Sequence, residues 1–417
     1  MKIAVLGAGL TGLTTAILLQ KEGFEVDVYE KESIPGGLAR SRIIDGYVFD
    51  LHGGHVYNSK IPGLNDWVFS RLKQDQWKLQ PRIAKILYKN MIIDYPFELS
   101  LKQLPIKEAI TCIKDLCAPR GQEPDNFHDW LIWNFGRAIA ERYMLPYNQK
   151  IWSYDLRQLG IYWVKGKMPL VTLDEVLQAV LTGAAEEKAM PHANFYYPLQ
   201  GGIQTFVNAL ASEVDNLILN TNINAVQKVD RHWIINGQAK YDFVISTLPL
   251  KELISIMKKQ LPAKIKQALE ALKHNSLTVT LVESFAENDY SWLYIPDKEY
   301  RTHRLVFQGN LSPNNCPTEH NSLTLESIGQ WEPEEQANEL RQKSWPSELK
   351  IGRIIASEYV KYAYIIFDQQ TPANLEIIFD YFKELAFKSI GRFGEWQYYN
   401  MDVSMSRAFT IVKEMVK

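Results

Sequence analysis

The feature that most constrains this chain is a glycine-rich turn close to its N-terminus. Residues 3–6 are all apolar, and Gly7-Ala8-Gly9-Leu10-Thr11-Gly12 follows them directly. Apolar residues then recur at helical spacing until Gly23, and a second strand-like run, residues 25–29, leads to Glu30. A buried strand, a tight glycine turn, a helix and another strand in this order predict a βαβ unit.

Each residue type in this unit has a physical reason. Gly7 permits the tight turn, Gly9 lets the backbone approach a pyrophosphate, and Gly12 lets the helix pack closely on the strand. The free N–H groups at the start of the helix attract phosphate. Glu30, about 20 residues further on, is placed to accept hydrogen bonds from ribose hydroxyls. The segment therefore predicts a dinucleotide-binding site.

A second glycine-rich segment indicates which dinucleotide is bound. Gly36-Gly37-Leu38-Ala39-Arg40-Ser41 follows shortly after Glu30. It resembles the second phosphate-side loop of the amine-oxidase-like flavoproteins, in which the arginine helps to neutralise the pyrophosphate. Arg40 can do so through charge-assisted hydrogen bonds. The series favours FAD over NAD, bound non-covalently.

Composition limits the other classes of protein. The 417 residues are 46% hydrophobic with a net charge of −2, which predicts two or three domains of roughly 100–200 residues each. The balanced charge offers no basic face for nucleic acid. No apolar run approaches the ~18 residues of a membrane span, and Cys112, Cys117 and Cys316 fit no metal or redox motif. We expect a cytoplasmic protein without a metal site, and the oligomeric state stays open.

The rest of the chain alternates between helical and strand-like stretches. Residues 217–229 and 241–246 are expected to be strands that return to the nucleotide-binding sheet, and Thr247 follows the second. Other ranges are expected to form a helix (67–78), a strand pair with a turn at Lys89-Asn90 (83–93), mostly helices (101–180) and mostly strands (276–366).

These patterns predict an α/β fold in which a Rossmann-type FAD-binding domain carries an inserted helical domain and an antiparallel-sheet substrate domain. The FAD-binding domain is discontinuous in this prediction, because strands of the nucleotide-binding sheet recur late in the chain. The predicted ranges are 1–60, 195–250 and 370–417 for the FAD-binding domain, 61–98 and 255–369 for the sheet domain, and 99–194 for the helical domain.

Several further motifs together resemble the UDP-galactopyranose mutase family, over nearly the whole chain. The segment at residues 146–152, Pro-Tyr-Asn-Gln-Lys-Ile-Trp, and the segment at residues 391–398, Gly-Arg-Phe-Gly-Glu-Trp-Gln-Tyr, are the most specific. The other similar segments are Gly53-Gly54-His55-Val56, Tyr95-Pro96-Phe97, Tyr197-Pro198 with Gly201-Gly202, Trp292-Leu293-Tyr294-Ile295-Pro296 ahead of Arg304, and Asn400-Met401-Asp402.

The resemblance implies a reaction and a set of site residues. In this family a UDP-hexopyranose becomes a UDP-hexofuranose, and N5 of the reduced flavin is the nucleophile at the anomeric carbon. By resemblance, His55 lies beside the flavin, Arg304 and Lys167 bind the substrate diphosphate, and Tyr364 is one of the substrate-site tyrosines. The protein's task would be to hold the diphosphate and stabilise its developing charge.

The chain departs from the family at the expected diphosphate site. Lys167 stands where the family has the first of its two arginines, and lysine cannot make the bidentate contact of arginine. Leu311 stands where a tyrosine hydroxyl normally reaches the diphosphate. Ile365 replaces the proline after Tyr364, and Ala408 replaces a glycine of the final helix. These departures leave the FAD motifs intact.

Three functions stay open on the sequence: a UDP-sugar mutase or close variant, an FAD-dependent oxidoreductase of the amine-oxidase or protoporphyrinogen-oxidase type acting on a non-nucleotide substrate, and a flavin-binding scaffold without turnover. The fold alone cannot decide among them. The predicted catalytic residues are His55, Arg304, Lys167 and Tyr364. The predicted cofactor-binding residues are Gly7, Gly9, Leu10, Thr11, Gly12, Glu30, Lys31, Gly37, Leu38, Arg40, Gly54, His55, Val226, Thr247, Gly391, Arg392, Asn400, Met401, Asp402 and Ser404.

Overall fold

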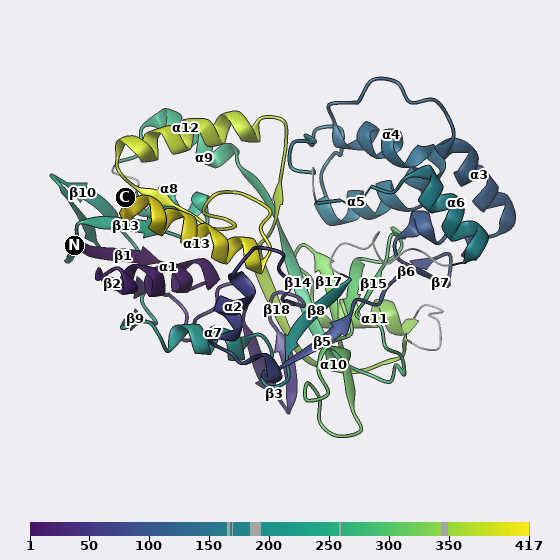
Figure 1. Ribbon diagram of the computed structural model, residues 1–417, viewed down its shortest axis with the longest axis horizontal. Helices are drawn as coiled ribbons and strands as arrows, with labels where there is room; N and C mark the ends of the chain where they lie inside the picture. Colours follow the sequence, from purple (N-terminus) through teal and green to yellow (C-terminus); the bar gives the residue numbers. More distant parts are fainter. Residues whose placement is uncertain (165–166, 169, 184–192, 258–259, 343–348, 417) are drawn as a thin grey trace.

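The computed structural model describes residues 1–164, 167–168, 170–183, 193–257, 260–342 and 349–416. Figure 1 shows a parallel-sheet region with its helices on the left, a group of helices at the upper right, and a mixed sheet between and below them. Within the described residues, no helix combines the length and the apolar composition that crossing a bilayer requires.

A five-stranded parallel sheet contains the N-terminal βαβ unit. Its strand order is β19-β13-β1-β2-β9, so the chain returns to this sheet after long excursions. The predicted strand–helix–strand unit is confirmed in position and direction, since β1 pairs with β2 in parallel. The strands are β1 (Lys2–Leu6), β2 (Glu25–Tyr29), β9 (Asn216–Ile218), β13 (Phe243–Ser246) and β19 (Lys388–Ser389).

Both faces of this sheet are covered, as a parallel sheet requires. Ile3 and Val5 belong to one apolar cluster, and Ala4 and Leu6 belong to another, because alternate side chains of a strand point to opposite faces. Helices α1 (Leu10–Lys21), α2 (Leu64–Phe69), α7 (Gln204–Ala211) and α13 (Met401–Val416) contribute to the first cluster. Helices α8 (Leu253–Ile256), α9 (Ala263–Ala271) and α12 (Thr371–Glu384) contribute to the second.

Two expected strands are each divided. Residues 217–229 are not one strand: β9 ends at Ile218, Asn220 has a positive φ of 52°, and the chain resumes as β10 in a separate three-stranded sheet. Residues 241–246 are divided at Asp242, where the chain passes from that sheet into β13. Apolar residues lie on both sides of each break, at Leu219 and Ile223 and at Tyr241 and Phe243, so the polar residues between them do not by themselves mark the end of a strand. The three-stranded sheet contains β10 (Val226–Val229), β11 (His232–Ile235) and β12 (Ala239–Tyr241).

The second large sheet has seven strands in the order β18-β14-β17-β16-β15-β6-β7. All neighbours are antiparallel except β15 and β6. The predicted turn at Lys89-Asn90 is confirmed, since both residues have positive φ, as a two-residue hairpin turn demands. The strands are β6 (Ala84–Tyr88), β7 (Met91–Asp94), β14 (Lys273–Ser284), β15 (Trp292–Tyr294), β16 (Thr302–Val306), β17 (Asn321–Ile328) and β18 (Ile351–Ile366).

The insert between these sheets is mainly helical, as expected for residues 101–180. Its helices are α3 (Ile106–Leu116), α4 (Phe127–Ile139), α5 (Leu145–Trp152) and α6 (Leu173–Thr182), with a π-helical turn at Ala140–Met144. Two short helices, α10 (Gln308–Leu311) and α11 (Pro333–Gln342), flank the mixed sheet. Two small antiparallel sheets complete the fold: a hairpin of β3 (Ser41–Ile44) with β4 (Tyr47–Asp50), and β5 (Trp77–Pro81) paired with β8 (Asn194–Pro198).

The helix expected over residues 67–78 is wrong in its second half. Helix α2 ends at Phe69, and Trp77 already begins strand β5. The Trp77 indole donates to the carbonyl of Leu72 at 3.0 Å, and its backbone pairs opposite Pro198. Strand pairing with a segment more than a hundred residues away thus overrides the local helical pattern. The Tyr95-Pro96-Phe97 segment also lies outside a strand, because β7 ends at Asp94 and a 3-10 turn begins at Phe97.

Candidate functional site

The first glycine loop has the backbone that close packing demands. Gly7 has a φ of 99°, and a Cβ atom there would lie 2.5 Å from the Thr247 hydroxyl. A Cβ atom at Gly12 would lie 2.0 Å from the carbonyl oxygen of Gly7. Helix α1 begins at Leu10 without a side-chain cap from Gly9 and without an acidic residue in its first turn. Its first N–H groups are therefore suited to an anion.

The second glycine loop lies directly against the first. Gly9 and Gly36 form a parallel β-bridge, and a Cβ atom at Gly37 would lie 3.1 Å from the Cα atom of Gly9. Arg40 donates from Nε to the carbonyl of Gly37 at 2.9 Å, and its Nη1 lies 3.4 Å from a carboxylate oxygen of Glu32. The two loops and the arginine thus form one cradle beside the N-terminus of α1.

The Glu30 carboxylate is fixed at the edge of this cradle. It is 8% exposed and follows the end of β2. Oε2 accepts the backbone N–H of Ala8 at 2.9 Å, and Oε1 accepts the backbone N–H of Glu32 at 3.1 Å. A carboxylate held by two backbone amides retains further lone pairs for ribose hydroxyls.

The C-terminal segment meets the same cradle. The Thr11 hydroxyl donates to the carbonyl of Ser404 at 3.0 Å, and a Cβ atom at Gly391 would lie 2.8 Å from the Thr11 oxygen. Thr247 donates to the carbonyls of Leu6 and Gly7 at 2.9 and 3.2 Å. Strand ends of the parallel sheet and the start of α13 therefore converge at one edge.

The remaining predicted cofactor residues differ in their surroundings. Met401 and Asp402 are buried in the first turn of α13. Leu38 is half-buried and packs against two core clusters. Lys31 and Asn400 are exposed. Val226 begins β10 and is fully buried in the core beside Ile235, so its side chain is placed for packing.

Arg304 and Glu326 form a buried ion pair on neighbouring strands of the mixed sheet. Arg304 donates from Nε to Oε2 at 2.8 Å and from Nη2 to Oε1 at 2.9 Å. The Glu326 side chain has no solvent exposure, whereas 23% of the Arg304 side chain is exposed. Burial raises the pKa of Glu326, and Arg304 opposes that rise. Burial lowers the pKa of Arg304, yet Glu326 and the nearby tyrosines together raise it well above its usual value.

The segment Gly53-Gly54-His55-Val56, here called the histidine loop, contacts the Glu326 carboxylate. A Cβ atom at Gly53 would lie 2.5 Å from Oε1 of Glu326, and the backbone N–H of Gly54 donates to Glu326. His55 donates from Nδ1 to the carbonyl of Gly53 at 2.6 Å. Burial, helped by the positive charges of Arg392 and Arg304, lowers the pKa of His55 to about 4. His55 is therefore neutral near neutral pH, with Nε2 as an acceptor.

Lys167 lies on the C-terminal side of the site, apart from the Arg304 pair. Its Nζ donates to the carbonyl of Tyr398 at 2.6 Å, and Arg392 lies 4.5 Å from the centre of the Tyr398 ring. Burial and the charge of Arg392 lower the pKa of Lys167, while Asp402 raises it. Lys165, two residues before Lys167 in the sequence, lies outside the described residues.

Tyr364 connects the two groups of cations. It sits near the end of β18, and its ring contacts Trp152 and His303 edge-on, each with centroids 6.2 Å apart. Burial raises the pKa of Tyr364, and the charges of Arg304 and Arg392 both lower it. The structure thus brings His55, Arg304, Arg392, Lys167 and Tyr364 into one neighbourhood.

Sequence reasoning missed two residues of this neighbourhood, Glu326 and His303. Glu326 is a lone acid within residues 322–328, Ser-Leu-Thr-Leu-Glu-Ser-Ile. An acid in such a strand signals a buried partner, and this signal could have identified Glu326.

Leu311, where the family has a tyrosine, has no solvent exposure and packs in the core. It supplies packing in place of a hydroxyl.

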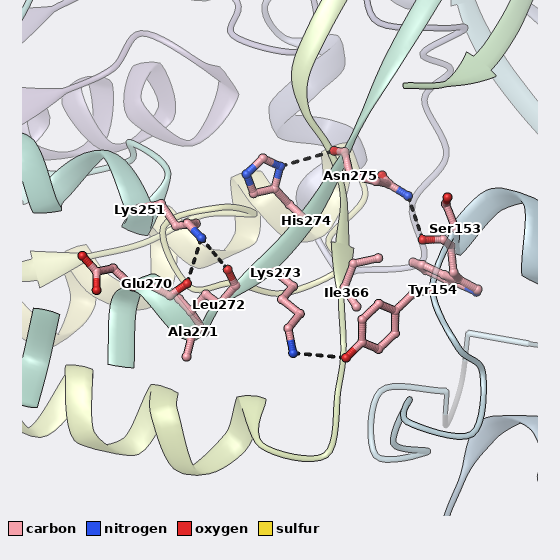
Figure 2. Close-up of a pocket in the computed structure, with 11 residues that line it drawn as sticks. Ser153, Tyr154, Lys251, Glu270, Ala271, Leu272, Lys273, His274, Asn275 and Ile366 are labelled. Carbon is pink, nitrogen blue, oxygen red and sulfur yellow. Dashed lines mark hydrogen bonds between the residues drawn. The ribbon is translucent and has the colours of Figure 1, made fainter. Parts of the chain in front are cut away.

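A pocket of about 340 Å³ lies between α9, the end of α5 and the start of β14 (Figure 2). None of the predicted site residues lines it. Figure 2 shows Lys251 donating to the carbonyls of Glu270 and Leu272, and Lys273 donating to the Tyr154 hydroxyl. Both amines join neighbouring elements, so these contacts hold the junction together.

Comparisons with known proteins identify the N-terminal unit. Residues 5–69 match the family described as NAD(P)-binding Rossmann-like domain. An uncharacterized protein from the nifH2 3′ region of Methanothermococcus thermolithotrophicus is 49% identical over 85 residues, which cover 20% of this chain and 78% of that protein. The chain belongs to the FAD/NAD(P)-binding Rossmann superfamily, together with that protein.

Two desaturases are similar to this chain over short segments. The 4,4′-diapophytoene desaturase of Staphylococcus aureus (strain COL) is 45% identical over 51 residues, and hydroxyneurosporene desaturase of Rubrivivax gelatinosus is 33% identical over 87 residues. These segments cover 12% and 19% of this chain, and only 10% and 15% of the two desaturases.

Over its full length the chain has the fold of a solved mutase. The crystal structure of reduced UDP-galactopyranose mutase matches with a TM-score of 0.90 and 23% identity, over 100% of this chain and 95% of that chain. A putative protoporphyrinogen oxidase from Exiguobacterium sp. 255-15 matches with a TM-score of 0.76 and 14% identity, over 100% and 98%. The predicted α/β fold class, with its parallel sheet and mixed antiparallel sheet, is confirmed.

Proposed function

We propose that the cradle binds FAD non-covalently. The residues fit a dinucleotide: two glycine loops in contact, an uncapped helix N-terminus, Arg40, and Glu30 held by backbone amides. A Cβ atom at Gly9 would meet no protein atom closer than 3.8 Å. Packing against the protein therefore does not require glycine at this position, whereas close approach of a ligand would. The contact of α13 with Thr11 extends the site toward the C-terminal motif.

We further propose that the enzyme interconverts the pyranose and furanose forms of a UDP-sugar. The observation that carries this proposal is the group of His55, Arg304, Arg392, Lys167 and Tyr364 beside the C-terminal motif. The likeness to reduced UDP-galactopyranose mutase over the whole chain supports it. When bound and reduced, FAD would supply the nucleophile, its N5 atom, for the anomeric carbon.

The chain's own residues would bind and orient the substrate and neutralise the charge of its diphosphate. Arg304 uses Nε and Nη2 on Glu326, and its guanidinium would share its donors between Glu326 and a substrate phosphate. Lys167 would add a second cation, and the Tyr364 hydroxyl would add a neutral donor. Preorganised donors of this kind stabilise the negative charge that develops on a departing diphosphate. Neutral His55 can accept a hydrogen bond through Nε2 without adding charge.

An FAD-dependent oxidoreductase acting on a non-nucleotide substrate is the second candidate. Two observations favour it: Arg304 is already neutralised by Glu326, and Leu311 offers no hydroxyl at the diphosphate site. The fold likeness to a putative protoporphyrinogen oxidase is consistent with it.

A panel of UDP-sugars tests the two candidates directly. The protein is reduced with dithionite under nitrogen, each UDP-sugar is added, and products are separated by chromatography. The mutase predicts a furanose product from reduced enzyme, none from oxidised enzyme, and no oxygen consumption. Equal conversion by both redox states would reject the flavin-nucleophile mechanism. Oxygen consumption that depends on a non-nucleotide substrate would support the oxidoreductase.

A further inference from the structure

Strand β16 contains an irregularity beside Arg304. Thr302 pairs with Ser327 and Arg304 pairs with Glu326, so His303 is an extra residue opposite a continuous partner strand. In a regular strand, neighbouring side chains point to opposite faces, and an extra residue re-aims them. Here His303 and Arg304 both approach Glu326: Nε2 of His303 lies 3.6 Å from Oε2, the oxygen that also accepts Arg304 Nε.

His303 is fully buried, and the described residues satisfy its ring poorly. Its side chain has no solvent exposure, neither ring nitrogen has a hydrogen bond of good geometry among the described residues, and the backbone of Glu326 is the nearby polar group that raises its pKa. Leaving a buried polar group unpaired costs free energy. The Glu326 carboxylate lies 3.6 Å from Nε2, beyond hydrogen-bond distance, and both of its oxygens accept from the Arg304 guanidinium. The ring is thus placed to donate to Glu326 only when Arg304 gives up part of its contact.

We propose that His303 is a positioning residue of the anion site. When Arg304 turns toward the phosphate groups of a ligand, His303 accepts a proton and replaces Arg304 as a hydrogen-bond donor to Glu326. The bond that forms is Nε2–H to Oε2, the bond that weakens is Arg304 Nε to the same oxygen, and the proton comes from solvent. A phosphate bound to Arg304 adds negative charge beside the Glu326 carboxylate. The positive charge of protonated His303 compensates for it.

The groups around His303 set the direction of this change. Burial, Arg304 on its own strand and Lys150 on α5 together lower the pKa of His303 well below the usual value. The backbone of Glu326 on β17 acts in the opposite direction. The rings of Tyr147 on α5 and Tyr364 on β18 lie 6.4 and 6.2 Å away. A bound diphosphate would add negative charge and draw Arg304 away, and both effects raise the pKa of His303.

The inference rests on the proposed function, because it needs a phosphate-bearing ligand at Arg304. The test uses the oxidised FAD-containing protein and UDP-galactose as the probe. The diphosphate of a UDP-sugar is esterified at both ends, so it lacks the second phosphate ionisation near pH 6 that would confuse the measurement. Calorimetric titration in PIPES and in Tris, buffers with different ionisation enthalpies, gives the number of protons taken up on binding.

The parent protein should take up a large fraction of one proton per UDP-galactose bound, and its Kd should rise about tenfold per pH unit, at most, as the pH increases through neutrality. His303→Gln can still donate to Glu326 but cannot ionise. It should bind UDP-galactose with a buffer-independent enthalpy and a Kd that changes by less than about twofold over that range. His303→Phe should do the same if it retains FAD.

A matched control is His320→Gln, because His320 lies 3.8 Å from Glu283 in another histidine–glutamate pair. This variant should keep the parental proton uptake. Binding of UDP-galactose without proton uptake by the parent overturns the inference and leaves the proposed function standing. Uptake that persists in His303→Gln places the proton on Glu326 instead, which also overturns it. No binding of any UDP-sugar by the parent overturns both.

Discussion

The Thr11 hydroxyl donates to the Ser404 carbonyl across a separation of 393 residues, and it joins the first turn of α1 to the first turn of α13. Gly391 comes so close to Thr11 that any side chain there would collide with it. The two ends of the chain therefore build one edge of the dinucleotide cradle, and the two glycine loops build the other.

Substitutions at two nearby glycines, Gly9 and Gly12, should distinguish an effect on FAD binding from an effect on folding. Gly9→Val should give a folded protein without FAD, because the new side chain meets the protein at no less than 3.8 Å from its Cβ but occupies space that a pyrophosphate needs. Gly12→Val should instead prevent folding, since its Cβ would lie 2.0 Å from the Gly7 carbonyl. Flavin absorbance of the denatured supernatant and circular dichroism measure both outcomes. Parental FAD content in Gly9→Val would contradict the cradle.

Local patterns predicted the N-terminal unit well because its physical causes are local. The strand, the turn and the helix occupy the expected residues, since glycine spacing and apolar periodicity act within a few residues. The same reasoning failed at residues 217–229. The apolar residues on either side suggest one strand, but polar residues occupy positions 220–222, where Asn220 makes the turn. The pairing of β9 with β2 shows where the parallel sheet ends.

The candidate site was predicted less completely, because its geometry depends on distant partners. Family motifs supplied Arg304 and Lys167 but not their contacts. Lys167 donates to Tyr398, 231 residues away, and Arg304 is paired with Glu326 on a neighbouring strand. The irregular pairing that turns His303 and Arg304 to one carboxylate leaves no trace in hydrophobic periodicity. Such features require the strand register.

The buried histidines predict how stability depends on pH. Burial lowers the pKa of His55 to about 4 and that of His52 to about 3, from the ordinary 6.5. Between about 6.5 and 4 the unfolded chain binds these protons and the folded chain does not, so stability is lost as the pH falls through this window. Burial raises the pKa of Asp50 to about 6 and that of Glu98 to about 7, which opposes the loss with two protons. The pKa of buried His303 is also well below its usual value, so a third histidine adds to the loss.

The net expectation is a free energy of unfolding that declines from about pH 6.5 to about pH 4. Urea denaturation at several pH values measures this slope. The double variant His52→Asn with His55→Asn should show a flatter or inverted profile, because the Asp50 and Glu98 contributions remain. An unchanged slope in the double variant would show that other groups govern the pH dependence.

The histidine loop is expected to be sensitive at Gly53. This residue has a φ of 90°, and a Cβ atom would lie 2.5 Å from Oε1 of Glu326. Gly53→Ala should therefore displace the loop or the Arg304–Glu326 pair and lower turnover, while FAD content stays parental. Gly63→Ala is the matched control, since its φ is 75° and a Cβ atom there meets nothing within 4 Å. Equal loss of activity in both variants would argue against a special role for the loop.

Lys167 should tolerate arginine better than alanine. Its amine reaches the Tyr398 carbonyl beside Arg392, at the C-terminal side of the site. Lys167→Arg keeps the charge and adds bidentate geometry, so affinity for UDP should be equal or higher. Lys167→Ala should weaken UDP binding by about 1.5–3 kcal/mol, the range of a single charge-assisted hydrogen bond. Tryptophan fluorescence titration with UDP measures both, and tighter binding by the alanine variant would exclude Lys167 from the site.

The sharpest prediction concerns the Arg304–Glu326 pair, because stability and activity should respond differently to its two residues. Arg304→Ala leaves a fully buried carboxylate unpaired, which should cost about 3–5 kcal/mol of stability. It should also cost about 2–4 kcal/mol of transition-state stabilisation in UDP-sugar turnover, as expected for the loss of one preorganised donor. The double variant Arg304→Ala with Glu326→Gln removes the unpaired charge, so stability should largely return.

Activity should not return with it, because the double variant still lacks the cation that binds the diphosphate. Urea denaturation and turnover of UDP-galactose by dithionite-reduced protein measure the two quantities, and flavin absorbance checks that FAD content is unchanged. Recovery of stability together with activity would mean that Arg304 serves only to neutralise Glu326. In that case the diphosphate site is lost, and the oxidoreductase becomes the better description of this flavoprotein fold.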